Sequence, residues 1–160
     1  DLILMHGPLY HLTDASDRRQ ALTEAFRVLK PGGTLLAFAI GRYAGSIYGI
    51  TEGLIYAPDY RAMIRREVET GVRRDPPAWA QTFPSAYFHL PDELGTEIEG
   101  AGLTCERVIG VIGPAWLVPD LDEAWADPEK RSALMEIARM HEDEPVLGPR
   151  MMAVGRKLPG

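Results

Sequence analysis

The feature that most constrains the fold is a strand–helix–strand unit in the first forty residues. Residues 2–5 form an unbroken apolar run, which is typical of a strand buried on both faces of a parallel sheet. The apolar residues that then recur at helical spacing are Leu22, Ala25, Phe26 and Leu29. A second apolar run covers residues 34–40. Strand, helix and strand in this order form a right-handed parallel unit, so the chain is predicted to be an α/β protein.

The residues around the apolar stripe mark the two ends of that helix. Asp14 and Ser16 precede the stripe, and their side-chain oxygens can accept from the first backbone amides. Lys30 complements the negative end of the helix dipole, and residues 31–33, Pro-Gly-Gly, end the helix sharply. These signals predict a helix between the two strands.

Length and composition exclude several classes of function. The 160 residues fit one domain, and the net charge of -6 argues against a nucleic-acid partner. The arginine pairs 65–66 and 73–74 are interleaved with acids and are predicted to be solvated. The single cysteine, Cys105, fits a reducing compartment. Because no apolar run approaches the ~20 residues of a membrane span and no signal peptide opens the chain, we expect a cytoplasmic protein with no membrane partner.

Residues 41–88 interrupt the alternation of strands and helices. They show no strand pattern, and two helices are predicted there, one over 47–55 and one from Pro58 to the Pro76-Pro77 pair. An insertion of this size commonly forms a lid or a substrate pocket, with a purely structural flap as the alternative. The other predicted elements are a helix over 91–101, a strand over 103–111, short helices opening at Asp120 and Asp127, and a strand over 151–157.

Several segments resemble class I S-adenosylmethionine-dependent methyltransferases that act on small molecules. The chain opens with DLILMHGPLYHL (1–12), and its first helix ends in RVLKPGG (27–33). In the family an acidic residue opens the fourth strand, a loop of the form GxLYHL follows it, and RVLKPGG precedes the fifth strand. The later segments YFHLPDEL (87–94) and EGAGL (99–103) resemble the family as well.

The resemblance implies the C-terminal half of a Rossmann-like sheet. Its strands would be the family's four, five, seven and six, with residues 41–88 as an inserted helical lid. The family's glycine-rich loop and the acidic residue that holds the ribose have no counterpart, because glycines 32–33, 100 and 102 lie at helix ends. Residues 1–160 are therefore expected to be a partial methyltransferase domain without the N-terminal cofactor-binding half, and to bind S-adenosylmethionine poorly alone.

The resemblance also implies a site at the end of the first strand. The residues that would border the methionine part of S-adenosylmethionine, largely through backbone atoms, are Met5, His6 and Gly7. Those that would border the methyl group and the acceptor are Leu9, Tyr10 and His11. His11 is the candidate base, because an unperturbed imidazole titrates at about 6.5, and Tyr10 would orient the acceptor or close over the methyl. The alternatives are local packing or capping for His11 and a wall position for Tyr10.

Three further residues are candidates for contact with the acceptor. Arg42 would hold an anionic acceptor, or else lie on the surface. Tyr43 would face the same cleft, and His89 would line its mouth. No group of His, Cys, Asp and Glu has metal-ligand spacing, so a metal-dependent catechol-type enzyme is disfavoured.

The expected function is methyl transfer to a small-molecule acceptor. The protein mainly has to hold donor and acceptor in line, which can contribute roughly 7–11 kcal/mol. An oxidoreductase would not explain RVLKPGG, and a non-catalytic interaction module or inactive fragment is the other alternative. A chain that began at Asp1 would expose the first strand as an apolar edge. We therefore expect a homodimer, or an unseen N-terminal segment, at that edge.

Overall fold

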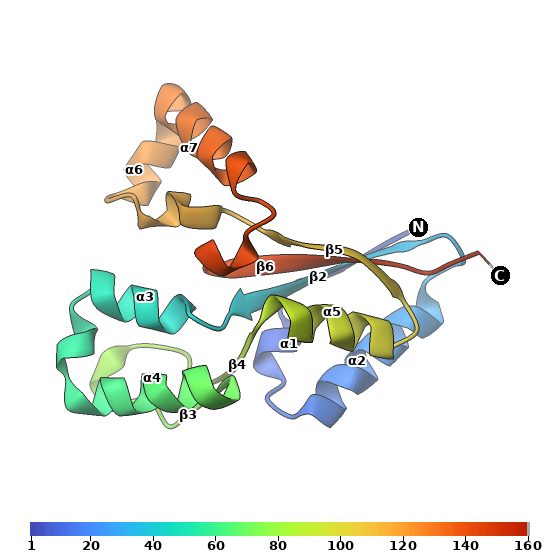
Figure 1. Cartoon of the computed structure of the whole chain (residues 1–160), viewed down its shortest axis with the longest axis horizontal. Coiled ribbons are helices and arrows are strands. Elements are labelled where there is room, and N and C mark those ends of the chain that lie inside the picture. Colours follow the sequence, from blue (N-terminus) through green and yellow to red (C-terminus); the bar gives the residue numbers. More distant parts are fainter. Residues whose placement is uncertain (160) are drawn as a thin grey trace.

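A computed structural model describes residues 1–159, and its centre is a strand that has partners on both edges (Figure 1). This strand is β2 (Thr34–Gly41), which pairs in parallel with β1 (Leu2–Met5). Its other edge pairs antiparallel with β6 (Arg150–Arg156), and β6 pairs antiparallel with β5 (Thr104–Gly110). The order β1–β2–β6–β5, with only β6 reversed, agrees with the half-sheet that the sequence predicts.

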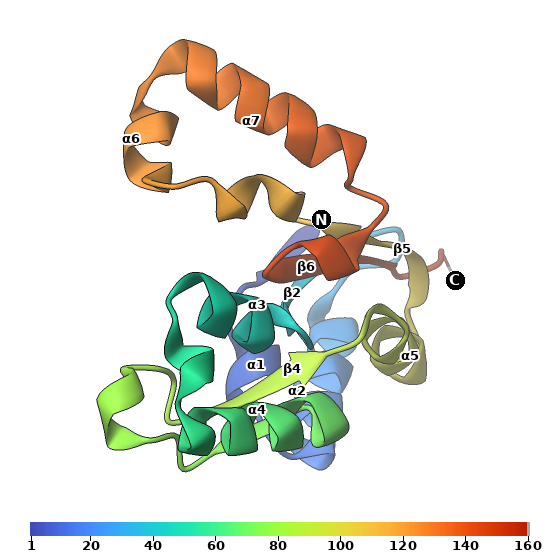
Figure 2. The ribbon, with the colours of Figure 1, turned by 60° about the vertical axis from the view of Figure 1, so that its left-hand side comes forward.

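Two helices, α2 (Ala15–Val28) and α5 (Pro91–Gly100), cover one face of this sheet (Figures 1 and 2). The residues that form the shared core are Met5, Leu9, Leu22, Ala25, Leu29, Leu35, Ala37, Ala39, Leu94, Ile98, Ala101, Leu103, Met151 and Ala153. The cation at the C-terminal end of α2 is Lys157 rather than Lys30. Its Nζ donates to the carbonyls of Phe26 and Leu29, at 2.7 and 2.8 Å, so the residue that follows β6 also caps the end of α2.

The opposite face of the sheet is largely bare at β1. Leu2 and Leu4 are 61% and 62% exposed, which corrects the expectation that this strand is buried on both faces. The reason is that side chains alternate along a strand, while α2 and α5 lie on one side only. On the other side, α6 (Leu121–Ala126) and α7 (Pro128–Met140) pack against each other and stand away from β1 (Figure 1).

Residues 41–88 contain strands as well as helices, so the prediction that this segment has no strand is wrong. Its helices are α3 (Ala44–Thr51), η1 (Leu54–Tyr56), α4 (Pro58–Thr70) and η2 (Ala78–Ala80). Its strands are β3 (Val72–Arg74) and β4 (Ser85–His89), which pair antiparallel. Both strands are short, and β4 joins β2 only at its last two residues. Neither strand therefore has room for the long alternating pattern by which strands are recognised in a sequence.

Helix α4 ends at Gly71 and not at the Pro76-Pro77 pair. Gly71 takes the left-handed conformation, with φ of 76°, and its amide donates to the carbonyl of Glu67. A Cβ at this position would lie 2.9 Å from the carbonyl oxygen of Phe88. Glycine therefore allows both the helix end and the close approach of β4.

Two short 3-10 helices connect the sheet to α6 and α7. They are η3 (Gly113–Leu117) and η4 (Pro145–Leu147). At α7 the predicted helix start is confirmed, and the Asp127 carboxylate caps it by accepting from the amides of Glu129 and Lys130. Asp120 makes no such cap at α6, since its backbone is left-handed, with φ of 52°. No helix within residues 1–159 combines the length and apolar composition that a membrane span requires.

Candidate functional site

The ends of β1 and β2 and the start of β6 meet at one edge of the sheet. Because β6 runs antiparallel, its first residue, Arg150, lies opposite Ile40 near the end of β2. β1 leads through Gly7 into the short helix α1 (Pro8–His11). Ligand sites in open α/β sheets lie at the carboxyl ends of the parallel strands, so this edge is the first place to look for a site.

A tight turn at Gly7 sets the direction of α1. Gly7 has φ of 138°, which residues with a side chain rarely adopt. Its carbonyl accepts from the amides of Tyr10 and His11, at 3.2 and 3.3 Å. The turn therefore brings these two side chains back over the end of the strands.

Tyr10 and His11 lie side by side and differ in exposure. Tyr10 is 6% exposed and packs in a cluster with Ile40 and Phe88, whereas His11 is exposed. Their ring centroids are 4.7 Å apart, and the Phe83 ring lies 5.9 Å from that of His11. Neither side chain hydrogen-bonds to another residue in the range 1–159. Tyr10 is therefore a buried packing residue, whereas the imidazole of His11 is accessible to a ligand.

The three residues expected to border the cofactor, Met5, His6 and Gly7, lie at the end of β1. Met5 and Gly7 are buried, while His6 is exposed and stacks at 4.9 Å on Phe38. Within residues 1–159, β1 pairs only with β2, so its other edge and its last backbone groups are open. The end of β1 therefore has an unpaired backbone edge within residues 1–159. S-adenosylmethionine carries no phosphate, and the contacts expected of Met5, His6 and Gly7 are made largely by backbone atoms. These contacts therefore need no charged side chain.

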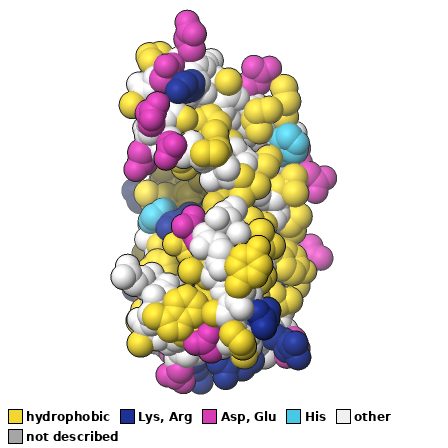
Figure 3. Space-filling view, turned by 90° about the vertical axis from the view of Figure 1, so that its left-hand side faces the viewer, with side chains coloured by type: hydrophobic (Ala, Val, Ile, Leu, Met, Phe, Trp, Pro, Cys, Tyr) yellow, Lys and Arg dark blue, Asp and Glu magenta, His cyan; other side chains and the backbone are white. Residues whose placement is uncertain are grey.

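A pocket of about 490 Å³ opens beside Tyr10. It is lined by Ile40, Ala44, Gly45, Tyr48, Arg73, Gln81, Thr82, Phe83, Pro84, Phe88, Trp116, Pro149 and Arg150. Figure 3 shows the molecule hollowed at the level between η3 and α3, with hydrophobic side chains at the base of the hollow. The volume and the mainly apolar walls are typical of a site for a small molecule.

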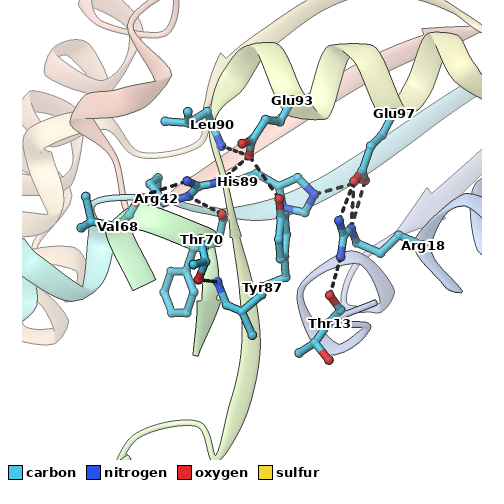
Figure 4. Close-up of polar contacts among 12 residues, drawn as sticks. Thr13, Arg18, Arg42, Val68, Thr70, Tyr87, His89, Leu90, Glu93 and Glu97 are labelled. Carbon is cyan, nitrogen blue, oxygen red and sulfur yellow. Dashed lines mark hydrogen bonds and ion pairs between the residues drawn. The ribbon is translucent and has the colours of Figure 1, made fainter. Parts of the chain in front are cut away.

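Arg42 does not line this pocket, which corrects the expectation that it holds an acceptor. It is 5% exposed, and its Nε and Nη1 donate to the carbonyls of Phe88 and Val68, at 2.8 and 3.1 Å. Its Nη2 lies 2.6 Å from the Glu93 carboxylate (Figure 4). Arg42 therefore ties together the end of α4, β4 and the start of α5.

His89 lies in the same buried polar cluster and not at the pocket mouth. It is 0% exposed, and its Nε2 is 3.3 Å from Oε2 of Glu97. Arg18 pairs with the other oxygen of Glu97 at 2.8 Å (Figure 4). Burial alone would raise the pKa of Glu97, but the hydrogen bonds from His89 and Arg18 outweigh it and hold that pKa below its ordinary value.

Two other expected site residues also lie elsewhere. Leu9 is 0% exposed and belongs to the core under the sheet, because α1 turns its apolar side toward α2. Tyr43 is 42% exposed and precedes α3, outside the residues that line the pocket. Leu9 is therefore a core residue, and the side chain of Tyr43 is partly exposed to solvent.

The sequence missed two arginines that line the pocket, Arg73 and Arg150. Arg73 was expected to be solvated but is 5% exposed, and its Nε donates to Oε2 of Glu67 at 2.6 Å. Glu67 is 0% exposed, and its Oε1 has no partner among the described residues. Burial raises the pKa of Glu67 to about 7, and Arg73 limits the rise. The only signal for this pair in the sequence is that Glu67 and Arg73 lie on either side of Gly71. This spacing predicts a contact only when the chain is known to turn at Gly71.

Comparisons with known proteins agree with this geometry. Residues 1–37, from β1 into β2, match a family described as "Methyltransferase domain". No curated protein matches the chain. The structure is similar to that of a SAM-dependent methyltransferase from Methanosarcina mazei, with a TM-score of 0.57 and 17% identity over the whole chain. The chain spans 60% of that protein's length. The match over residues 1–37 supports the resemblance that these residues carry in the sequence, and the similarity to the solved methyltransferase shows a shared fold.

Proposed function

We propose that the chain forms the acceptor side of a methyltransferase site and takes part in methyl transfer from S-adenosylmethionine to a small molecule. The observation that carries the proposal is the pocket of about 490 Å³ beside Tyr10, at the edge where β1 and β2 end. The family match over residues 1–37 includes the turn that positions Tyr10 and His11.

In this proposal the end of β1 meets the cofactor. S-adenosylmethionine, when bound, supplies a methyl group that leaves its sulfur as a bond to the acceptor forms. The backbone at Met5, His6 and Gly7 borders the methionine part, and the open edge of β1 leaves these groups available. Tyr10 closes the space between this edge and the pocket, because it packs against Ile40 on the pocket wall.

His11 is placed to receive a proton from the acceptor. It is exposed, makes no hydrogen bond within residues 1–159, and lies beside Phe83, which lines the pocket. A neutral imidazole accepts a proton near pH 7. This step applies to an acceptor that carries a proton to lose, such as a hydroxyl or an amine.

The test is His11→Gln in the whole protein, with S-adenosylhomocysteine formation followed by mass spectrometry. Loss of a general base lowers turnover by about 10²–10⁴-fold. We expect the affinity for S-adenosylmethionine to stay nearly unchanged, because residues 5–7 border the methionine part of the cofactor in this proposal. His141→Gln is the matched control, since His141 lies at the end of α7, where its Nδ1 contacts the carbonyl of Ile137. Unchanged turnover in His11→Gln would remove His11 as the base.

The bare face of β1 favours a second candidate, an interaction module without catalysis. Leu2 and Leu4 are exposed there, and a second copy or another segment would cover them. The two candidates differ in one measurement. A module of this kind would form no S-adenosylhomocysteine with any acceptor offered, although it would still associate through β1.

A further inference from the structure

We propose that the pocket beside Tyr10 takes an aromatic carboxylate, whose anionic group is held by Arg150. This inference rests on the proposed function, because it names the substrate class for the same pocket. Three properties of the walls support it: their charge, the fixed position of Arg150, and their aromatic surface.

The charge of the lining is positive and only partly compensated. The lining residues include two arginines and no carboxylate. The guanidinium of Arg73 already has a partner in the carboxyl group of Glu67, 2.6 Å away. Arg150 is partly buried, and its guanidinium makes no ion pair or hydrogen bond with any residue from 1 to 159. A guanidinium beside apolar walls lacks hydrogen-bond acceptors. An anionic ligand would supply both the acceptors and the opposite charge.

The position of Arg150 is set by the sheet and not by a loop. Arg150 opens β6 opposite Ile40 of β2, and its own carbonyl accepts from the amide of Val111, at 3.1 Å. Its Cζ lies 5.6 Å from the centroid of the Tyr10 ring. The guanidinium thus stands over the residue that separates the pocket from the end of β1. A planar guanidinium at this position can bind a carboxylate through two parallel hydrogen bonds.

The rest of the lining fits a flat apolar ring. Its aromatic members are Tyr48, Phe83, Phe88 and Trp116. Aromatic side chains bind ring systems by offset or edge-to-face stacking. Arg73 already stacks on Phe88, with its Cζ 4.5 Å from the ring centroid, which holds that wall in place. The volume of about 490 Å³ has room for one or two fused rings with a side group.

The inference is tested by binding to the chain in the absence of cofactor. The probes are 2-naphthoate and its neutral amide, 2-naphthamide, measured by calorimetry at fixed ionic strength. We expect naphthoate to bind more tightly than naphthamide. Arg150→Met should weaken naphthoate by about 10- to 100-fold, the range for lost hydrogen bonds to a charged group, and leave naphthamide nearly unchanged. Arg150→Lys should restore part of the affinity, since it keeps the charge without the fork.

The matched control is Arg65→Met, which removes the same charge from an exposed position on α4. Circular dichroism and thermal unfolding of each variant exclude a folding defect as the cause. Equal binding of naphthoate and naphthamide, an Arg150→Met variant that binds naphthoate like the wild type, or no binding of naphthoate at millimolar concentration would each overturn the inference.

Failure of this inference is distinguishable from failure of the proposed function. Arg150-dependent binding of naphthoate without any methyl transfer by the whole protein would support the pocket assignment and contradict the activity. Methyl transfer to neutral acceptors that is insensitive to Arg150→Met would support the activity and contradict the carboxylate.

Discussion

At the scale of single residues, the ion pair between Glu67 and Arg73 is the most costly feature near the pocket. Both side chains are buried, and Oε1 of Glu67 has no hydrogen-bond partner among the described residues. Helix α3 passes directly over the pair at Gly45, where a Cβ would meet both side chains. A buried carboxylate with one free oxygen loses much of the hydration that it has in the unfolded chain, so the charged form is disfavoured.

The stability of the protein should therefore depend on the protonation of Glu67. Its pKa rises from 4.5 to about 7 on folding, so between these values the folded state holds a proton that the unfolded state has released. The contribution of this group to the free energy of unfolding is fully present below pH 4.5. It is lost as the pH rises to about 7, and the total loss is about 3 kcal/mol. Relative to wild type, Glu67→Gln should gain this amount between pH 4.5 and 7.5, in urea unfolding at several pH values.

The control for this measurement is Glu69→Gln, an exposed residue on the same helix. Its unfolding free energy should follow that of the wild type over the whole range. A constant difference between Glu67→Gln and wild type at every pH would show that Glu67 keeps its ordinary pKa.

At the scale of elements, Arg18 joins the two helices that cover the sheet. It is 2% exposed, and its guanidinium pairs with Glu97 of α5 at 2.8 Å. The same guanidinium donates to the carbonyls of Leu12 and Thr13, at 3.0 and 2.9 Å, and stands 3.6 Å above the centroid of the Tyr87 ring. One side chain therefore connects the end of α1, α2, β4 and α5 (Figure 4).

Arg18→Met should destabilise the fold more than an ordinary surface change. The substitution removes the closest partner of the Glu97 carboxylate and the Arg18 donor to two backbone carbonyls. Breaking one side of a buried pair costs about 3 kcal/mol, which chemical denaturation will measure. Arg19→Met, at the next and exposed position of α2, should change the unfolding free energy by less than about 0.5 kcal/mol. Equal effects of the two substitutions would contradict the role given to Arg18.

At the scale of the whole molecule, the layers around the sheet are unequal. Helices α2 and α5 bury one face, whereas the face that carries Leu2 and Leu4 is open at β1. The backbone of β1 also has a strand on one side only within residues 1–159. An open apolar face beside an unpaired edge is a template for association with another chain.

We therefore expect residues 1–160 to self-associate through β1. Light scattering after size-exclusion should show a mass that rises with protein concentration. Leu4→Lys, which places a charge on the open face, should shift the chain toward the monomer. Met140→Lys is the control, because Met140 is equally exposed, at 64%, but lies at the end of α7. A wild-type chain that stays monomeric at all concentrations would contradict the expectation.

The main elements of the half-sheet could be predicted from the sequence alone, together with the resemblance that residues 1–37 carry. The apolar runs of β1 and β2, the stripe of α2 and the Pro-Gly-Gly stop are local signals, and a local pattern is enough to predict a buried strand or a helix end. The sequence also selected Tyr10 and His11, which the structure brings to the edge of a pocket. These residues follow β1 within one turn, so no long-range contact was needed to place them.

Only the tertiary structure decided which polar side chains face a ligand. In the sequence Arg42 and His89 are candidate acceptor contacts and Arg73 is expected in solvent, yet packing buries all three beside charged or polar partners. Arg150 reaches the pocket because β6 returns antiparallel beside β2 from more than a hundred residues away. The cost of burying a charge depends on every neighbour that contacts it. For that reason the charge of the pocket follows from the fold and not from any one segment of the sequence.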